Sequence, residues 1–351
     1  MSKFQVNWDV ELEKEIFSIT LVENNRALGI VHSSLKRFSF FSLEKKEVIW
    51  NFLASRHGII SEPENIQDVM LFSDTSQKKS WVHATSSGEI NRISGLVEDD
   101  FFMGKFGKYA IFFREDSSEV FLDVESLKLR ESQAKGEGVG IIYAVGDKFI
   151  GGELSEEGNN FVVGKFCEEK GLIMEDSVTL IKLPVEFGLY KPIACNEECF
   201  VIRAQDNNYF GVMSWNGELR QKFEIKVQCD YFFANHRFLC NQHGKYIFIL
   251  NYLSYESNTY RFFGVNLVDG QILWETCTPS ELIYGFVIHK GYIVFSYGDD
   301  SKAMKLNTLN GELSMLIDEP IQSKSFCSDG ENLYFARLSK GANCLACGSF
   351  S

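Results

Sequence analysis

The spacing of cysteines is the first indication of possible chemistry in this sequence. Cys344 and Cys347 are separated by two residues, a spacing that can bind a metal ion or form a redox-active disulfide. A structural zinc site needs four ligands, usually two such pairs, and Cys195 and Cys199 are the nearest to a second pair. We therefore expect no metal and no cofactor, and we interpret the cysteines as free thiols buried in strands.

The histidines form no catalytic or metal-binding pattern. The six are His32, His57, His83, His236, His243 and His289. None belongs to a His-x-His or His-Glu-x-x-His pair, and no Gly-x-x-x-x-Gly-Lys phosphate loop occurs. His243 and His289 fall at expected turns, where we expect solvent around them. A Ser/His/Asp set drawn from distant positions stays open, but no spacing supports one. We predict that the protein is not an enzyme.

A repeat along the chain supplies the elements that would position any site. Residues 264–275, GVNLVDGQILWE, have the pattern of a strand, a turn with glycine and a second strand. Similar segments place turns at Lys46, Gly88, Ser126 or Leu127, Gly171, Gly217, Gly270 and Gly311. A period of about 40–50 residues with four strands in each repeat is typical of a β-propeller.

The period predicts an all-β fold, a single β-propeller over residues 1–351 with eight four-stranded blades, or seven as the alternative. In the third repeat, for example, we expect strands at 101–106, 109–115, 119–124 and 127–132. The last blade takes strands at 324–327, 333–338 and 344–350 and a fourth from 4–10. This sharing closes the ring and removes a free edge. The alternative count follows if Asp9 caps a helix instead.

The segment at 264–275 resembles the repeat of quinoprotein-dehydrogenase (PQQ-like) β-propellers, roughly Ala-x-Asp-x-x-Thr-Gly-Lys-x-x-Trp. The corresponding positions are Gly264, Asn266, Asp269, Gly270, Gln271 and Trp274, and Trp50 has the equivalent place in the first repeat. The resemblance implies eight blades with the tryptophan packed between neighbours. It does not extend to the cofactor, because the adjacent cysteines of that family are absent. The Gly-His and Trp-Asp signatures of WD-repeat (WD40-like) propellers are absent as well.

The net charge and the composition limit the classes of binding partner and the compartment that we expect. The net charge is −13 at pH 7, whereas proteins that bind nucleic acids or anionic membranes are normally basic, so we expect neither partner. No leader sequence or membrane-length apolar run is present, and nine scattered cysteines suit a reducing compartment, so we expect a cytoplasmic protein. An acidic surface suits a basic protein partner.

The expected fold places many of the acids together. Loops between the second and third strands, and connections between blades, emerge on one face. The candidate partner-binding residues on it are Glu98, Asp99, Asp100, Glu115, Asp116, Glu156, Glu157, Asp206, Tyr252, Tyr255, Glu256, Asp299 and Asp300. The two tyrosines fit the role of interface anchors. We expect mixed charge on the opposite face.

These patterns favour a non-catalytic protein-binding propeller with an acidic loop face. Its most specific form is a bacterial immunity protein, or antitoxin, that inhibits a basic toxin or effector domain. One alternative is an enzyme or small-ligand binder that uses the central channel, which requires convergent polar residues on innermost strands that are mostly apolar. Another is a scaffold subunit of a larger complex, which would expose an apolar patch.

Overall fold

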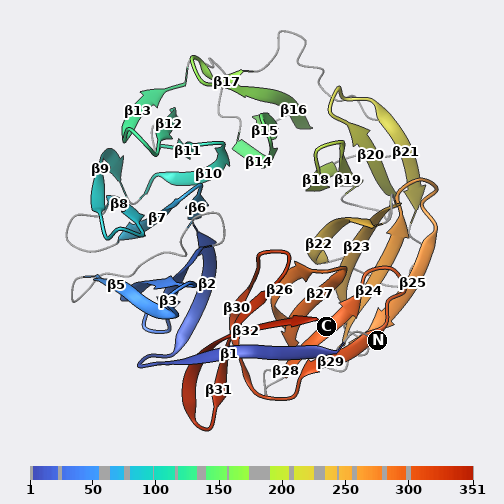
Figure 1. Cartoon of the computed structure of the whole chain (residues 1–351). Coiled ribbons are helices and arrows are strands. Elements are labelled where there is room, and N and C mark those ends of the chain that lie inside the picture. The colour runs from blue at the N-terminus through green and yellow to red at the C-terminus, as the bar shows by residue number, and fades with distance from the viewer. Residues whose placement is uncertain are drawn as a thin grey trace. The chain divides into compact units, whose positions relative to one another are not determined.

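The regular elements of the chain are β-strands (Figure 1). The computed structural model describes residues 3–22, 26–54, 64–74, 80–97, 99–114, 118–132, 140–155, 158–173, 190–204, 209–224, 234–242, 245–254, 259–278, 283–297 and 302–350. Among these residues, no helical segment has the length and hydropathy of a membrane span.

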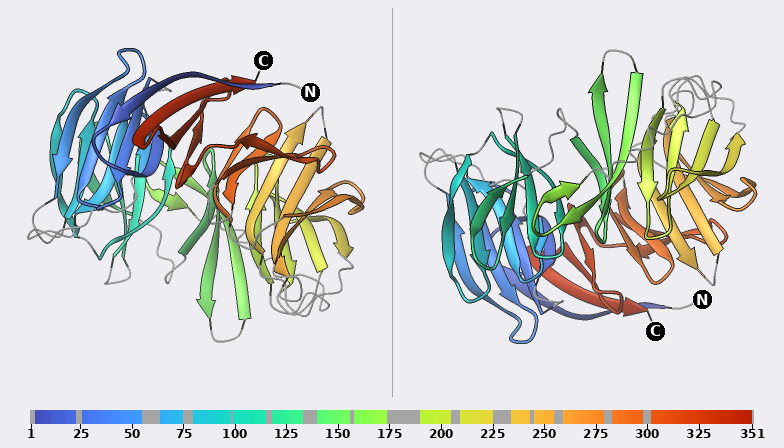
Figure 2. Two further views of the ribbon diagram at one scale, coloured as in Figure 1. Left: turned by 90° about the horizontal axis from the view of Figure 1, so that it is seen from below. Right: turned by 90° about the horizontal axis from the view of Figure 1, so that it is seen from above.

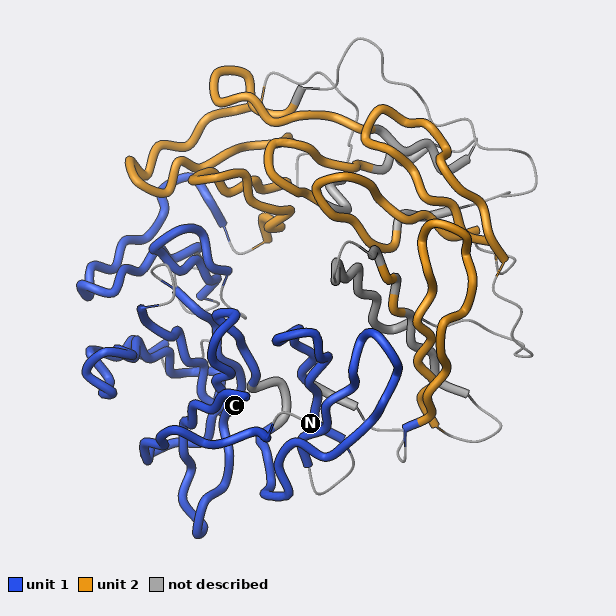
Figure 3. The backbone as a smooth tube through the Cα atoms, turned by 45° about the vertical axis from the view of Figure 1, so that its right-hand side comes forward, with its two compact units in different colours: residues 1–98, 278–351 blue, residues 99–277 orange. Residues whose placement is uncertain are grey.

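Across the described residues, the strands form eight four-stranded antiparallel sheets, the number that the period predicts. Each sheet is the meander of a propeller blade, in which consecutive strands are hydrogen-bonded neighbours, except that β1 joins the last sheet beside β32. The chain divides into two compact units (Figure 3). Unit 1 comprises residues 1–98 and 278–351, and unit 2 comprises residues 99–277. The single domain over residues 1–351 stays a prediction.

Unit 1 contains four of the sheets. Their strands are β2 (Ile16–Val22), β3 (Ala27–His32), β4 (Arg37–Ser42) and β5 (Glu47–Leu53); β6 (Glu64–Ile66), β7 (Val69–Asp74), β8 (Ser80–Thr85) and β9 (Ile90–Val97); β26 (Ile283–His289), β27 (Tyr292–Tyr297), β28 (Lys302–Asn307) and β29 (Leu313–Ile317); and β30 (Ile321–Ser328), β31 (Leu333–Ser339), β32 (Ala342–Phe350) and β1 (Phe4–Leu12).

Unit 2 contains the other four sheets. Their strands are β10 (Phe101–Phe106), β11 (Tyr109–Phe113), β12 (Glu119–Asp123) and β13 (Lys128–Glu131); β14 (Gly140–Val145), β15 (Lys148–Ser155), β16 (Gly158–Cys167) and β17 (Gly171–Ile173); β18 (Tyr190–Cys195), β19 (Cys199–Ala204), β20 (Tyr209–Ser214) and β21 (Leu219–Glu224); and β22 (Ala234–Gln242), β23 (Lys245–Ser254), β24 (Thr259–Asn266) and β25 (Ile272–Cys277).

The N-terminal strand completes the C-terminal sheet, as predicted. β1 pairs antiparallel with β32 over its length, from Phe4 opposite Phe350 to Leu12 opposite Asn343 (Figure 2). The helix considered from Asp9 onward is wrong, because the alternating exposed and half-buried residues of β1 are those of an edge strand. Arg337 of β31 reinforces the pairing through ion pairs with Asp9 of β1 and with Glu319 before β30.

The recurring turn position requires left-handed backbone. It lies between the third and fourth strands of a sheet, and φ is positive at Lys46, Gly88, Leu127, Gly171, Gly217, Gly270 and Gly311. Glycine adopts this conformation without a steric penalty, which explains its recurrence. In the third repeat the residue is Leu127 rather than Ser126.

The same position also contacts the preceding sheet. Trp50 of β5 donates its indole N–H to the carbonyl of Ser86 at 3.1 Å, and a Cβ on Gly88 would lie 3.4 Å from its ring. In unit 2, a Cβ on Gly270 would overlap Phe223 of β21. Each glycine therefore lets an aromatic side chain of one sheet pack against the turn of the next.

Bulges interrupt the register at equivalent places. The first strand of most sheets shifts register, as between Ile16 and Ser18 or between Pro192 and Ala194. A second shift recurs beside the fourth strand, between Phe40 and Phe41, Val212 and Met213, Gly264 and Val265, and Ala303 and Met304. A bulge on an edge strand disturbs the row of backbone groups that would otherwise accept another strand.

Candidate interaction surface

Most of the predicted partner-binding residues lie outside the described residues. These are Glu98, Glu115, Asp116, Glu156, Glu157, Asp206, Tyr255, Glu256, Asp299 and Asp300. Tyr252 lies in β23, with its backbone paired to Arg261. Asp99 is exposed, as expected, but Asp100 is only 4% exposed, so its carboxylate cannot belong to an exposed acidic face. The acidic loop face therefore stays a prediction.

A second set of acids lies at the opposite end of the sheets in unit 2. This turn end carries the turns between first and second strands and between third and fourth strands. Besides Glu125, which pairs with Lys108, its exposed carboxylates are Asp147, Glu168, Glu169, Glu197, Glu198, Glu218 and Asp269, and we call these seven the turn surface. Arg130 of β13 donates to the carbonyl of Glu168 in the β16–β17 turn at 3.4 Å, and Trp215 of the β20–β21 turn donates to that of Asn196 in the β18–β19 turn at 2.9 Å.

Two lysines of these turns, Lys108 and Lys148, are already engaged, whereas Lys170 is exposed. Lys108 pairs with Asp123 at 3.2 Å and with Glu125 at 3.0 Å, and these carboxylates raise its pKa. Lys148 donates to the carbonyl of Glu197 at 3.4 Å and lies over the ring of Trp215. The mixed charge expected for this face thus gives way in unit 2 to an excess of carboxylates. In unit 1, Lys45 and Lys46 are exposed at the equivalent end.

One carboxyl group at the other end of unit 2, the loop end, differs from these. Glu119 begins β12 and is partly buried, and burial raises its pKa to about 7. No hydrogen bond or ion pair of its carboxylate occurs within the described part of the chain. Asp123 on the same strand shows the usual outcome. Burial acts to raise its pKa, but hydrogen bonds from the Ser126 amide and Lys108 outweigh this and lower the pKa.

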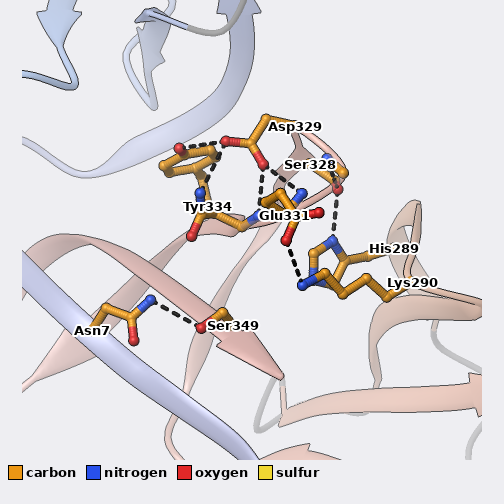
Figure 4. A network of polar contacts seen from close by, with 10 residues as sticks. Asn7, His289, Lys290, Ser328, Asp329, Glu331, Tyr334 and Ser349 are labelled. Carbon is orange, nitrogen blue, oxygen red and sulfur yellow. Dashed lines mark hydrogen bonds and ion pairs between the residues drawn. The ribbon is translucent and has the colours of Figure 1, made fainter. Parts of the chain in front are cut away.

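Two histidines form hydrogen-bonded pairs with serines. His32 Nε2 and Ser39 Oγ are 2.7 Å apart, and His289 Nδ1 and Ser328 Oγ are also 2.7 Å apart (Figure 4). His32 and Ser39 are buried, so a substrate cannot reach this hydroxyl. His289 is 1% exposed, and the prediction that it is solvated is wrong.

The surroundings of His289 are those of a structural junction. Lys290 reaches Glu331 at 2.9 Å, which ties the β26–β27 turn to the β30–β31 turn (Figure 4). Asp329 accepts hydrogen bonds from Tyr334 at 2.8 Å and from the amides of Glu331 and Asn332. The hydrogen-bonding capacity of the Asp329 carboxylate is therefore used within the β30–β31 turn and the start of β31.

Cys344 and Cys347 point to opposite faces of β32. Cys347 is paired with Tyr334, and Cys344, three positions earlier, is paired with Arg337. Since successive side chains alternate, residues three apart cannot share a face. Within the described residues, no group of three or more His, Cys, Asp or Glu could hold a metal ion. Cys199, Cys344 and Cys347 are buried thiols, as predicted, but Cys277 is exposed.

Comparisons with solved structures show the β-propeller fold. The chain is similar to BamB from Moraxella catarrhalis, with a TM-score of 0.56, 10% identity and coverage of 99% of this chain and 100% of that one. It is also similar to the C-terminal WD40 domain of Sif2, with a TM-score of 0.59, 11% identity and coverage of 99% and 98%.

A third similar structure is an enzyme. Dihydro-heme d1 dehydrogenase NirN, in complex with DHE, gives a TM-score of 0.60 at 11% identity, covering 97% of this chain and 75% of that one. No family model and no curated protein matches the sequence. Likenesses at this identity carry the fold alone, so function must be argued from the chain's own residues.

Proposed function

We propose that this chain is a non-catalytic β-propeller that binds a basic protein through carboxylates at the ends of its sheets. The turn surface of unit 2 is the observation that carries the proposal, because its carboxylates are exposed while Lys108 and Lys148 are engaged. Such a surface attracts a positively charged partner over distance and accelerates its association. The predicted loop acids would add to the negative electrostatic potential that attracts this partner.

The most specific form of this function is the inhibition of a basic toxin or effector, as an immunity protein or antitoxin does. Its support is the acidic charge, which complements an enzyme that itself binds an anionic substrate. Co-production tests it, since the partner alone should arrest growth and this chain should restore it. A partner that is harmless when produced alone would rule out this form.

We also propose that the chain is a divergent relative of the quinoprotein-type propellers. The position of Trp50, which bridges to Ser86 and Gly88 of the next sheet, supports this relationship. In that family the equivalent tryptophan packs between blades in the same way.

Affinity capture followed by matched charge variants tests the proposed function. Tagged full-length protein is exposed to lysate of its source cells at low and high salt, and the captured protein is identified and purified. One variant set neutralises the turn surface (Glu168→Gln, Glu169→Gln, Glu197→Gln, Glu198→Gln), and the other neutralises predicted loop acids (Glu115→Gln, Asp116→Asn, Glu156→Gln, Glu157→Gln). Both sets remove the same charge.

We expect a basic partner whose affinity falls about tenfold or more with added salt and with at least one variant set. The set that weakens binding identifies the end of unit 2 that contacts the partner. A partner without basic character, or one that binds both sets as tightly as the unchanged protein, would contradict the proposal.

A further inference from the structure

Three residues form a row across the first sheet of unit 2. Phe101 of β10 is paired with Phe113 of β11, and Phe113 is paired with Glu119 of β12. Because directly paired residues in an antiparallel sheet project to the same face, the three side chains lie on one face of this sheet at its loop end. We call them the Phe101–Glu119 row.

The two outer members of the row are in unfavourable surroundings for their chemistry. Phe101 is 69% exposed, so a large aromatic ring faces water. Glu119 is partly buried without a partner in the described part of the chain. Buried acids elsewhere are satisfied, as Asp74 is by Arg92 at 2.7 Å. An unpaired carboxylate removed from water is costly, as is a solvated aromatic ring.

One type of ligand would relieve both costs. We infer that the Phe101–Glu119 row receives an arginine side chain from the basic partner protein, with the guanidinium bound to the Glu119 carboxylate and stacked against the Phe101 ring. A guanidinium is planar, forms paired hydrogen bonds with a carboxylate and stacks on aromatic rings, whereas an ammonium group supplies only a point charge. The inference rests on the proposed function and specifies the cation recognised.

The row adds a specific contact at the loop end of unit 2 to the charge of the turn surface. It lies at the loop end, beside exposed Asp99 and on the strands that border the predicted loop acids Glu115 and Asp116. The turn surface lies at the opposite end of the same sheets. Arginine at the row would therefore place a short-range, geometrically specific contact within the predicted acidic loop face.

Binding of defined peptides to the full-length protein tests the inference. The probes are hexa-arginine and hexa-lysine at one fixed ionic strength, and calorimetry measures their affinities. The variants are Glu119→Gln and Phe101→Ala. Their matched controls in the same unit are Glu131→Gln, which removes an exposed carboxylate from β13, and Val268→Ala, which truncates a side chain that is 74% exposed. Circular dichroism confirms that each variant is folded.

We expect the unchanged protein to bind hexa-arginine about fivefold or more tightly than hexa-lysine. Glu119→Gln and Phe101→Ala should each weaken hexa-arginine binding about tenfold and remove the preference, while the controls stay within about twofold. If both variants bind hexa-arginine as the controls do, the inference is wrong. Absence of hexa-arginine binding by the unchanged protein also overturns it, while the capture experiment still decides the proposed function.

Proton release gives a second readout that a purely structural role would not produce. An arginine beside Glu119 stabilises the carboxylate and should displace protons near pH 7, up to about half a proton per site. Titrations in two buffers of different ionisation enthalpy measure the release. Glu119→Gln should abolish it and Glu131→Gln should leave it unchanged. Equal release from the unchanged protein and from Glu119→Gln would overturn the inference.

Discussion

Glycine at the turn between third and fourth strands meets two steric demands at once. Gly270 has a φ of 71°, and a Cβ there would overlap Phe223 of the preceding sheet. At Lys46 only the first demand applies, and its ammonium group lies 5.5 Å over the ring of Trp8 instead. Backbone conformation and packing between sheets are therefore coupled at this one position.

Substitution of Gly270 separates the two demands. Gly270→Ala should lower the free energy of unfolding by about 2–4 kcal/mol, because strain and overlap with Phe223 add. Gly146→Ala is the control, since φ is 64° there but nothing lies within 4 Å of the new methyl group. It should cost about 1 kcal/mol. Urea unfolding measures both values, and equal losses would contradict the packing role.

Single residues also show what a sequence can reveal. The turn glycines are predictable because their requirement is local and repeats with the period. Glu119 is not, since its partial burial depends on the strands that pair beside it and on the sheet packed against them. The same holds for Asp100, which reads as one of three consecutive acids yet is buried.

The element with the longest-range pairing is β1. The other strands of its sheet, β32, β31 and β30, come from the other end of the described chain, and Arg337 links Asp9 of β1 to Glu319. The Arg337 side chain is 10% exposed, whereas its two carboxylate partners are 40% and 53% exposed. Loss of the guanidinium would leave both acids close to water, so the expected penalty is moderate.

Arg337→Gln should therefore loosen β1 selectively. We expect a loss of about 1–2 kcal/mol, with amide exchange in β1 accelerating more than exchange in β2 to β5. Lys302→Gln removes the more exposed pair with Asp318, and should cost at most about 0.5 kcal/mol. Hydrogen exchange followed by mass spectrometry measures the difference. If amide exchange accelerates equally in all strands of unit 1, Arg337 does not stabilise β1 locally.

At the same scale, strand positions follow from sequence more readily than register. β10 has the predicted bounds, because alternation and turn residues mark both of its ends. The bulges in first and fourth strands leave no such mark, since an extra residue such as Leu273 has an ordinary strand composition. Register is set by the partner strand and not by local pattern.

For the molecule as a whole, buried groups make opposing contributions to the dependence of stability on pH. Burial lowers the pKa of His32 and of His289 below 6.5, with Arg37 and Lys290 adding to the effect. The unfolded chain therefore takes up these protons first, and stability falls as the pH drops below about 6.5. Glu119 acts in the opposite direction. Its folded pKa of about 7 exceeds the unfolded value of 4.5, so stability rises as the pH falls from 7 toward 4.5.

Glu119→Gln should remove the contribution of Glu119 to the pH dependence of stability. At pH 8 the variant should be more stable than the unchanged protein by an amount on the order of 2 kcal/mol, because a charged, partly buried carboxylate has been removed. By pH 5, close to the unfolded pKa of 4.5, most of this difference should be gone. Denaturant unfolding at both pH values measures it, with Glu131→Gln as the control. A difference of equal size at the two pH values would contradict the assignment.

The net charge of the whole molecule can be calculated from the sequence, but the distribution of charge over the surface cannot. The fold class and its period follow from repeated local patterns, and the structure confirms them. The turn surface does not follow in this way, because it depends on which lysines, such as Lys108, find partners in the folded chain.

The pairing of β1 with β32 also constrains how the protein is made. Asn7 and Ser349, which are hydrogen-bonded, lie 342 positions apart, so β1 leaves the ribosome long before β32 exists. During translation β1 therefore remains without its partner strand. In a chain that is truncated before residue 342, β1 never acquires that partner. Completion of this sheet thus reports that the chain has been synthesised through β32.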